Sequence, residues 1–296
     1  MRPFDPATFT PILTGDGSST FFSDEFGEWF HSREGAYAEA QQTYVKVTRL
    51  AELAKGNQLA LLDVCYGLGY NSAAALETIW RVNPDCHVTL RALEIDLAVP
   101  QAAVREAMPF AIATQLVKAE FTPVSHAMRA LAAETVCQTP TLDAQLLIGD
   151  ARQQIFRLAG WLADAIFLDP FSPTRCPQLW TVEFLQQVVS CLKPTGRLAT
   201  YSCAAAVRAA LHQVGLQIGS TAAAGRQWPG TVASLTETTL PPLSQREQAH
   251  LQTRAAVPYR DPTLTATAAE IVAERKLRQQ QSALESTGNW RRRWLS

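Results

Sequence analysis

The residues that follow the apolar run at 165–168 are of types that can handle an amine. Asp169 is followed by Pro170 and Phe171. A short apolar run that ends in turn-forming residues predicts a strand buried on both faces, and proline keeps the strand from continuing. A carboxylate at the end of such a strand can hold a cationic or nucleophilic nitrogen, and an aromatic ring can form a flat wall beside it. The alternative is that Asp169 only opens a turn, which Asp-Pro commonly does.

A loop with two glycines follows the strand predicted at residues 59–64. The order strand, glycine loop and helix is typical of the first unit of a nucleotide-binding α/β fold. The loop lacks the third glycine of a dinucleotide fingerprint, which favours a cofactor without a phosphate. The residues that we expect to bind the cofactor here are Asp63, Tyr66, Gly67, Gly69 and Asn71.

Acidic residues also end the next two predicted strands. Glu94 ends the strand at 88–94, where its carboxylate can accept hydrogen bonds from both hydroxyl groups of a ribose. Asp150 and Ala151 follow the strand at 144–148, where they are placed to bind the amino group of an adenine. Acids collect at turns in many proteins, but here each one follows an apolar strand.

The order of the predicted elements agrees with a nucleoside cofactor. Strands and helices alternate over residues 59–236, and an antiparallel pair is predicted at 216–219 and 232–235. We therefore expect an α/β, Rossmann-like fold with a mostly parallel sheet and a C-terminal antiparallel hairpin. The acids suit S-adenosyl-L-methionine, which carries ribose hydroxyls, an adenine amine and a methionine ammonium but no phosphate. The layout is that of a class I S-adenosylmethionine-dependent methyltransferase.

The composition limits the cellular setting and the partners. Of the 296 residues, 47% are hydrophobic and 18% are charged, which is ordinary for a globular protein. The chain has no apolar run of about 18 residues and no signal-peptide core, so we expect a cytoplasmic protein without a membrane partner. The six cysteines form no Cys-x-x-Cys pair, which favours free thiols and no metal. A net charge of -1 neither demands nor excludes RNA, because RNA affinity depends on a local basic face.

Two further segments flank the predicted methyltransferase domain at 56–236. Residues 1–55 are rich in aromatic and acidic residues, and we expect a lid or substrate-side segment with a helix at 36–54. Residues 237–296 are more polar and predict a helical C-terminal extension. Its basic and aromatic end, 290–294, is interpreted either as a solvated arm or as a contact with nucleic acid.

Several motifs resemble the methyltransferase domain of the MnmC family, bifunctional enzymes that modify the wobble uridine of tRNA. Residues 167–173 (Phe-Leu-Asp-Pro-Phe-Ser-Pro) and 177–181 (Pro-Gln-Leu-Trp-Thr) resemble its signature. Residues 195–208, and the Gly-Thr-Val-Ala-Ser run at 230–234, resemble other segments of that domain. The resemblance extends from about residue 20 to residue 236, and it is nearest to the free-standing bacterial form of the domain.

The resemblance implies methyl transfer from S-adenosyl-L-methionine to 5-aminomethyl(-2-thio)uridine at the wobble position of tRNA. The product would be the 5-methylaminomethyl nucleoside, and the anticodon stem-loop would be the partner. The family also carries an FAD-dependent oxidase domain. This sequence shows no dinucleotide fingerprint that would match that domain and has no room for it. We therefore expect no FAD, and dependence on a separate enzyme that makes the aminomethyl substrate.

The resemblance also suggests roles for single residues. Asp169 is the candidate for orienting the amine and the methionine end of the cofactor, and Phe171 is the candidate for stacking on the uracil. Three further aromatic residues are expected either to stack on the flipped base or to pack in the core, and two arginines are expected to contact tRNA. These residues are Phe22, Trp29, Phe30, Arg208 and Arg226.

Two alternatives stay open at this point. The first is a small-molecule amine methyltransferase, or an aminopropyltransferase, on the same fold. The second is a module that holds tRNA without chemistry, which is suggested by Cys65 at the family's first loop glycine and by lost positive charge after Arg226. Turnover of free amines would favour the first alternative, and failure to bind S-adenosyl-L-methionine would favour the second.

Overall fold

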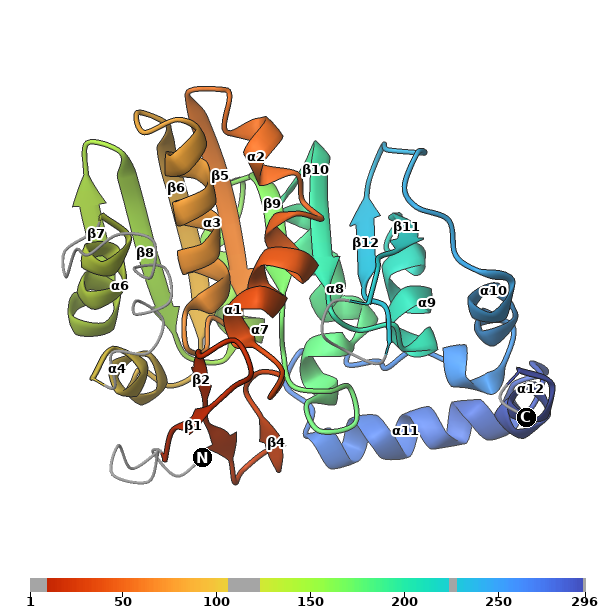
Figure 1. Ribbon diagram of the computed structural model, residues 1–296. Coiled ribbons are helices and arrows are strands. Elements are labelled where there is room, and N and C mark those ends of the chain that lie inside the picture. Colours follow the sequence, from red (N-terminus) through yellow and green to blue (C-terminus); the bar gives the residue numbers. More distant parts are fainter. Residues whose placement is uncertain (1–9, 106–122, 224–227, 295–296) are drawn as a thin grey trace.

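The computed structural model describes residues 10–105, 123–223 and 228–294 of the chain. Its centre is an eight-stranded sheet in the order β11-β12-β10-β9-β5-β6-β8-β7 (Figure 1). Five neighbouring strands are parallel: β5 (Gln58–Val64), β6 (His87–Glu94), β8 (Leu142–Ile148), β9 (Ala163–Leu168) and β10 (Leu192–Thr200). The antiparallel strands are β7 (Val136–Thr139), β11 (Gln217–Ser220) and β12 (Thr231–Ser234).

The order of the strands reverses between β5 and β9. The chain moves from β5 through β6 to β8 on one side, and it then returns to add β9 and β10 on the other side. Ligands of open α/β sheets bind outside the carboxyl ends of the strands at such a switch point. The structure therefore confirms the predicted Rossmann-like sheet and its C-terminal antiparallel hairpin, and it places the ends of β5 and β9 side by side.

Helices cover both faces of the sheet (Figure 1). Adjacent residues of β5 point to opposite faces, so that Leu61 belongs to one buried core and Leu62 to the other. The first core contains residues of α3 (Tyr70–Val82), α4 (Ala98–Arg105) and α6 (Pro123–Glu134). The second contains residues of α7 (Ala151–Gln154), η4 (Ile155–Leu158), α8 (Val182–Ser190) and α9 (Ala205–Gln213).

Two predicted helices are wrong in detail. Residues 125–137 are predicted from the sequence to form one helix, but α6 ends at Glu134, because Thr135 takes a left-handed backbone with φ 60° and turns the chain into β7. The helix expected at 36–54 is broken into α1 (Ala36–Glu39), the π-helix η2 (Ala40–Val45) and α2 (Leu50–Leu53). Arg49, with φ 61°, separates the last two pieces. Both breaks come from backbone conformations that apolar spacing does not reveal.

Short ribbons from the N-terminal segment lie at the carboxyl edge of the sheet (Figure 1). The strands β1 (Ile12–Leu13) and β2 (Ser19–Thr20) form one antiparallel pair. The strands β3 (Phe22–Ser23) and β4 (Glu28–Trp29) form the other. Both ribbons belong to residues 1–55, the segment predicted from the sequence to be a lid or substrate-side segment.

The C-terminal extension folds against the core. It contains α10 (Gln245–Leu251), η6 (Arg254–Ala256), α11 (Ala268–Gln281) and α12 (Thr287–Trp294). Asp261 is fully buried and accepts a hydrogen bond from Arg152 Nη1 at 2.9 Å. Nowhere in the part of the chain that the structure describes is a helix both long and apolar enough to cross a membrane.

Acid is expected to weaken the contact between α10 and the core. Burial acts to raise the pKa of the Glu247 carboxyl, but hydrogen bonds from Ser220, Ser244 and Arg208 outweigh burial and hold the pKa at about 2. Because the pKa is lower in the folded state than its ordinary 4.5, this carboxylate stabilises the fold above pH 4.5. That stabilisation, up to about 3 kcal/mol, is lost as the pH falls toward 2.

Urea denaturation between pH 7 and pH 2 measures this contribution. The unchanged protein should lose more stability over that range than Glu247→Gln, which lacks the titrating group. Identical pH dependence in the two proteins would contradict the assignment.

Candidate active site

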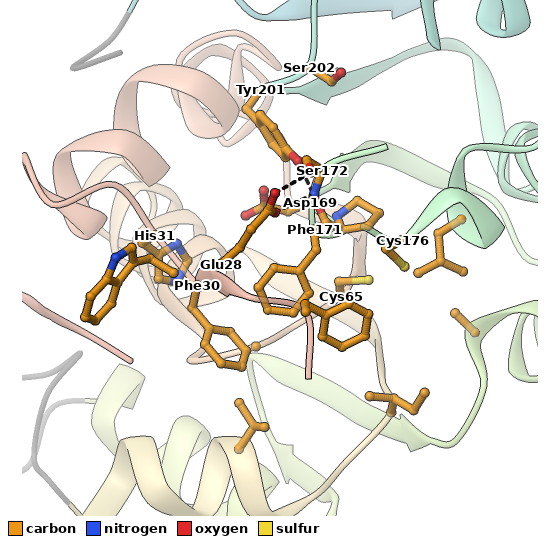
Figure 2. A pocket seen from close by; sticks show the side chains of 18 of the residues that line it. Glu28, Phe30, His31, Cys65, Asp169, Phe171, Ser172, Cys176, Tyr201 and Ser202 are labelled. Atoms are coloured by element: carbon orange, nitrogen blue, oxygen red, sulfur yellow. Dashed lines mark hydrogen bonds between the residues drawn. The ribbon is translucent and has the colours of Figure 1, made fainter. Parts of the chain in front are cut away.

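A cavity of about 850 Å³ opens at the carboxyl ends of the parallel strands. It is lined from one side by the β3–β4 ribbon and from the other by the loops after β5, β6, β8, β9 and β10 (Figure 2). Ligand cavities in proteins usually measure about 300–1,000 Å³. The cavity is therefore large enough for a nucleoside cofactor and for part of a second molecule.

Asp169 lies at the cavity wall directly after β9. Its backbone N–H donates to the Val64 carbonyl at 3.1 Å, and its Oδ2 accepts from Asn71 Nδ2 at 2.9 Å. The side chain of Asn71 is buried and is not part of the cavity lining. Asn71, which we expected to bind the cofactor, thus holds the Asp169 carboxylate.

Each of the next three residues is held by a different element. The Tyr201 hydroxyl donates to the Pro170 carbonyl at 2.8 Å, and Trp180 Nε1 donates to the Phe171 carbonyl at 2.9 Å. The Ser172 N–H donates to Glu28 Oε2 at 2.9 Å, and the Ser172 hydroxyl donates to the other oxygen of the same carboxylate. The segment from Asp169 to Ser172 is therefore fixed before any ligand binds.

Glu94 ends β6 and lines the same cavity. Its Oε2 accepts from the Gly67 N–H at 2.8 Å, and its Oε1 accepts from the backbone N–H groups of Ile95 and Asp96 at 2.8 and 3.1 Å. Burial raises the pKa of this carboxyl, while the three backbone hydrogen bonds act to lower it. A carboxylate offers about four acceptor positions, so acceptor capacity is left for a ribose hydroxyl.

Asp150 lines the cavity at the start of α7, with Ala151 beside it. Its Oδ1 accepts from the Arg152 N–H at 2.9 Å, which caps the helix. Arg152 Nη2 also pairs with Asp150 Oδ2 at 2.7 Å, while Arg152 Nη1 reaches the buried Asp261. Both predicted residues are thus at the cavity, and the C-terminal extension helps to hold them.

Of the predicted glycine-loop residues, only Gly67 lines the cavity. Gly69 has φ 83° and begins α3, and a Cβ there would lie 2.7 Å from the Tyr66 hydroxyl. Tyr66 is buried and packs away from the cavity, with its hydroxyl 3.1 Å from Met128 Sδ. Gly69 and Tyr66 therefore shape the loop from behind.

Asp63 also lies behind the cavity wall. It is fully buried, and its Oδ2 accepts from the Ser72 hydroxyl at 2.6 Å. Among the described residues, its Oδ1 has no hydrogen-bond partner. Burial raises the pKa of this carboxyl well above its ordinary value, and the charges of Asp169 and Glu94 raise it further. Asp63 thus supports the start of α3 and is not part of the cavity lining.

Cys65 occupies a backbone conformation that favours glycine. It lines the cavity with φ 69°, in the left-handed region that costs other residues about 1–2 kcal/mol. Cys65→Gly removes this strain, but it also makes the unfolded chain more flexible, which lowers stability. The net effect is expected to raise the free energy of unfolding by roughly 0.5–1 kcal/mol. Cys65→Ala keeps the strain, so urea denaturation should show it to be less stable than the glycine variant. A glycine variant less stable than the alanine variant would contradict backbone strain at Cys65.

Aromatic rings form the wall beside Asp169. Phe26 stacks on Phe171 with ring centroids 4.4 Å apart, and Phe30 meets the same ring edge-on at 5.1 Å. Trp29 lines the cavity as well. Phe22 is 42% exposed, packs against Trp29 and is not part of the lining. The structure therefore brings Phe171, Trp29 and Phe30 to the site and leaves Phe22 outside it.

The predicted tRNA contact Arg208 lies inside the protein. Its side chain is 1% exposed, and its guanidinium donates to Thr231, to the Gly230 carbonyl and to Glu247. We assign Arg208 to the structure of the hairpin. Arg226 lies outside the described residues. Sequence reasoning missed Glu28, Tyr201 and the cavity-lining Trp228, although all three lie within the range of about 20 to 236 over which the chain resembles the MnmC domain.

The donors and acceptors of the cavity suit S-adenosyl-L-methionine. Carboxylates at the carboxyl ends of β6, β8 and β9 can accept from ribose hydroxyls, an exocyclic amine and an ammonium. Ile95, which is 37% exposed, gives the cavity an apolar surface next to Glu94. Within the described ranges, no group of three or more His, Cys, Asp and Glu side chains is arranged to hold a metal ion.

Known proteins that resemble this chain include S-adenosyl-L-methionine-dependent methyltransferases, in agreement with the cofactor that the cavity suits. Residues 113–236 match the model of a family described as S-adenosyl-L-methionine-dependent methyltransferases. The chain is 29% identical over 242 residues to the tRNA 5-methylaminomethyl-2-thiouridine biosynthesis bifunctional protein MnmC of Cupriavidus necator, covering 79% of this chain and 35% of that protein. The MnmC of Paracidovorax citrulli is 32% identical over 208 residues, 67% of this chain and 31% of that protein. The chain thus spans about a third of the length of these relatives.

A solved structure covers nearly the whole chain. MnmC2 from Aquifex aeolicus superposes with a TM-score of 0.79 and 31% sequence identity, covering 93% of this chain and 86% of that one. The match therefore extends over most of both proteins. The chain therefore belongs to the family of S-adenosyl-L-methionine-dependent methyltransferases that includes MnmC2.

Proposed function

We propose that this protein methylates the amino group of 5-aminomethyl(-2-thio)uridine at the wobble position of tRNA. The product is the corresponding 5-methylaminomethyl nucleoside. The observation that carries the proposal is the fixed Asp169–Ser172 segment, which presents a carboxylate and an aromatic ring beside the cofactor cavity. A carboxylate can hold the amine of such a substrate, and an aromatic ring can stack on its base.

Residues of three strand ends would hold the cofactor. Glu94 would accept from the ribose hydroxyls, Asp150 and Ala151 would contact the adenine, and Asp169 would lie at the methionine end. When bound, S-adenosyl-L-methionine supplies an electrophilic methyl group on a sulfonium. The proposal involves no metal and no FAD.

The aromatic wall would position the uracil and exclude water. Phe171, Phe30 and Trp29 offer faces and edges on which a flipped base can stack. An alkylammonium has no lone pair, so the substrate amine must be neutral when it reacts. Removal of water favours the neutral form of an amine.

The two carboxylates near the ring would orient the amine. Asp169 and Glu28 both line the cavity, and Figure 2 shows their side chains on the same side of the Phe171 ring. Positive charge develops on the amine nitrogen as it is methylated, and a fixed carboxylate stabilises such charge in a site from which water is excluded. Holding the amine in line with the methyl group can contribute several kcal/mol.

The partners follow from the reaction. The tRNA anticodon stem-loop carries the substrate, so we place the reaction in the cytoplasm. The aminomethyl group must be made by a separate reaction, because methyl transfer adds one carbon to an amine that is already in place. The MnmC relatives are named for tRNA 5-methylaminomethyl-2-thiouridine biosynthesis. Their names support tRNA as the substrate of the proposed reaction.

The amine requirement is tested with synthetic anticodon stem-loops and labelled S-adenosyl-L-methionine. One RNA carries 5-aminomethyluridine at the wobble position, a second carries uridine, and a third carries 5-carboxymethylaminomethyluridine. We expect label only in the first RNA. Label in the uridine RNA would move the target away from the amine, and equally fast labelling of free amines would indicate a small-molecule amine methyltransferase.

A further inference from the structure

The charge of the protein is divided between the core and the C-terminal extension. Residues 237–296 contain nine Lys and Arg against six Asp and Glu, whereas residues 1–236 contain 17 against 21. Three of the six acids of the extension pair with arginines of the core: Glu237 with Arg197, Glu247 with Arg208, and Asp261 with Arg152. The extension therefore keeps cationic side chains that its own acids do not neutralise.

These cations begin at the rim of the active-site cavity. Trp228 lines the cavity and is 43% exposed, and the Arg246 guanidinium lies 5.2 Å from the centre of its ring. Arg246 also lies near Cys203, another residue of the cavity lining. Burial raises the pKa of the Cys203 thiol, and the positive charges of Arg208 and Arg246 act to lower it. Arg246 thus lies directly beside a residue of the cavity wall.

The series continues from α10 to α12. The indole N–H of Trp290 donates to the Arg246 carbonyl at 3.1 Å, and the His250 ring stacks on Trp290 at 4.1 Å. Burial lowers the pKa of His250, and the positive charges of Arg208, Arg291 and Arg246 lower it further. Figure 1 shows α10 and α12 side by side at one end of the molecule.

Two exposed arginines follow on α12. Arg291 and Arg292 are exposed, and the eight-residue helix contains no acid. Arg293 differs, because it pairs with Glu285 at 2.5 Å. In the part of the chain that the structure describes, no carboxylate lies at ion-pair distance from Arg246, Arg291 or Arg292. We call Trp228, Arg246, Arg291 and Arg292 the basic strip.

We propose that the basic strip binds the tRNA backbone next to the nucleotide whose base enters the cavity. A row of guanidinium groups that starts beside a stacking aromatic ring matches phosphates that continue from a flipped base. The strip also offers a local basic surface on a protein whose net charge is -1, and RNA affinity depends on such a surface more than on the net charge. The inference rests on the proposed function for the identity of the RNA.

The test is the binding of fluorescently labelled tRNA between 50 and 200 mM KCl. The variant Arg291→Gln/Arg292→Gln removes two charges from the strip. Its matched control, Lys46→Gln/Lys55→Gln, removes two exposed charges from outside the extension. We expect the strip variant to bind roughly tenfold more weakly at 100 mM KCl, with the log–log salt slope reduced by about 1–2. The control should change affinity by less than about twofold.

A second readout separates this inference from the proposed function. Methyl transfer to the free 5-aminomethyluridine nucleoside needs no tRNA contact, so the strip variant should retain it. Unchanged tRNA affinity in a folded strip variant would overturn the inference and assign the strip to another partner, such as an acidic protein. Weakened tRNA binding together with no methylation by the unchanged protein would leave the strip in place and remove the proposed reaction.

Discussion

Asp169→Asn is expected to lower kcat/KM for the aminomethyl RNA by about 100-fold or more. The substitution keeps the size of the side chain and an acceptor for Asn71, but it removes the charge that stabilises the developing ammonium. Misplacement of the amine by about 1 Å has a cost of the same order. Binding of S-adenosyl-L-methionine, measured by calorimetry, should weaken much less than catalysis, because Glu94 and Asp150 are unchanged.

The matched control is Asp164→Asn on the same strand. Asp164 Oδ2 accepts from the Ala60 N–H and pairs with Lys193 Nζ, both at 2.8 Å, one strand length away from the cavity. This variant should change the unfolding free energy and leave kcat/KM within about threefold. An Asp169→Asn protein that folds, binds the cofactor and still methylates at the original rate would remove Asp169 from the mechanism.

Glu94→Ala is expected to raise the Kd for S-adenosyl-L-methionine by roughly 10- to 100-fold. One hydrogen bond from a ribose hydroxyl to a carboxylate contributes about 1.5–3 kcal/mol. The substitution also leaves the N–H groups of Gly67, Ile95 and Asp96 without their acceptor, so the loop that faces the cofactor loses its support. Glu94→Gln keeps one acceptor oxygen, so its Kd for S-adenosyl-L-methionine should lie between those of the unchanged protein and Glu94→Ala.

Asp143→Asn provides the comparison for Glu94. Asp143 lies on the neighbouring strand β8 and pairs with Arg91 at 2.8 Å, outside the cavity lining. Its loss should leave the Kd for the cofactor unchanged. If Glu94→Ala binds S-adenosyl-L-methionine as tightly as the unchanged protein, the ribose is held by other groups and the proposed placement of the cofactor is wrong.

The strand ends were predictable because each combines an apolar run with a terminal acid. Such a pattern fixes both the strand and the edge of the sheet where the acid lies, so Glu94, Asp150 and Asp169 were located correctly from the sequence. The strand order reverses between β5 and β9, and this switch point brings the strand ends together as in other doubly wound sheets.

The residues behind the cavity were not predictable from local pattern. Asn71 holds Asp169 across 98 positions of the chain, and Trp180 reaches the Phe171 carbonyl from a separate helix. Arg208 is buried and pairs with Glu247 of the C-terminal extension. Each of these roles depends on a tertiary contact that leaves no signal in the spacing of neighbouring residues.

The most direct measurement of the proposed reaction uses bulk tRNA from cells that lack this methyl group. The tRNA is incubated with the protein and labelled S-adenosyl-L-methionine, digested to nucleosides and separated, and the labelled nucleoside is identified by mass. We predict that the label is found in 5-methylaminomethyl(-2-thio)uridine and that Asp169→Asn loses it while Asp164→Asn retains it. Label in any other nucleoside, or no label from a protein that binds the cofactor, would contradict methylation of the wobble amine.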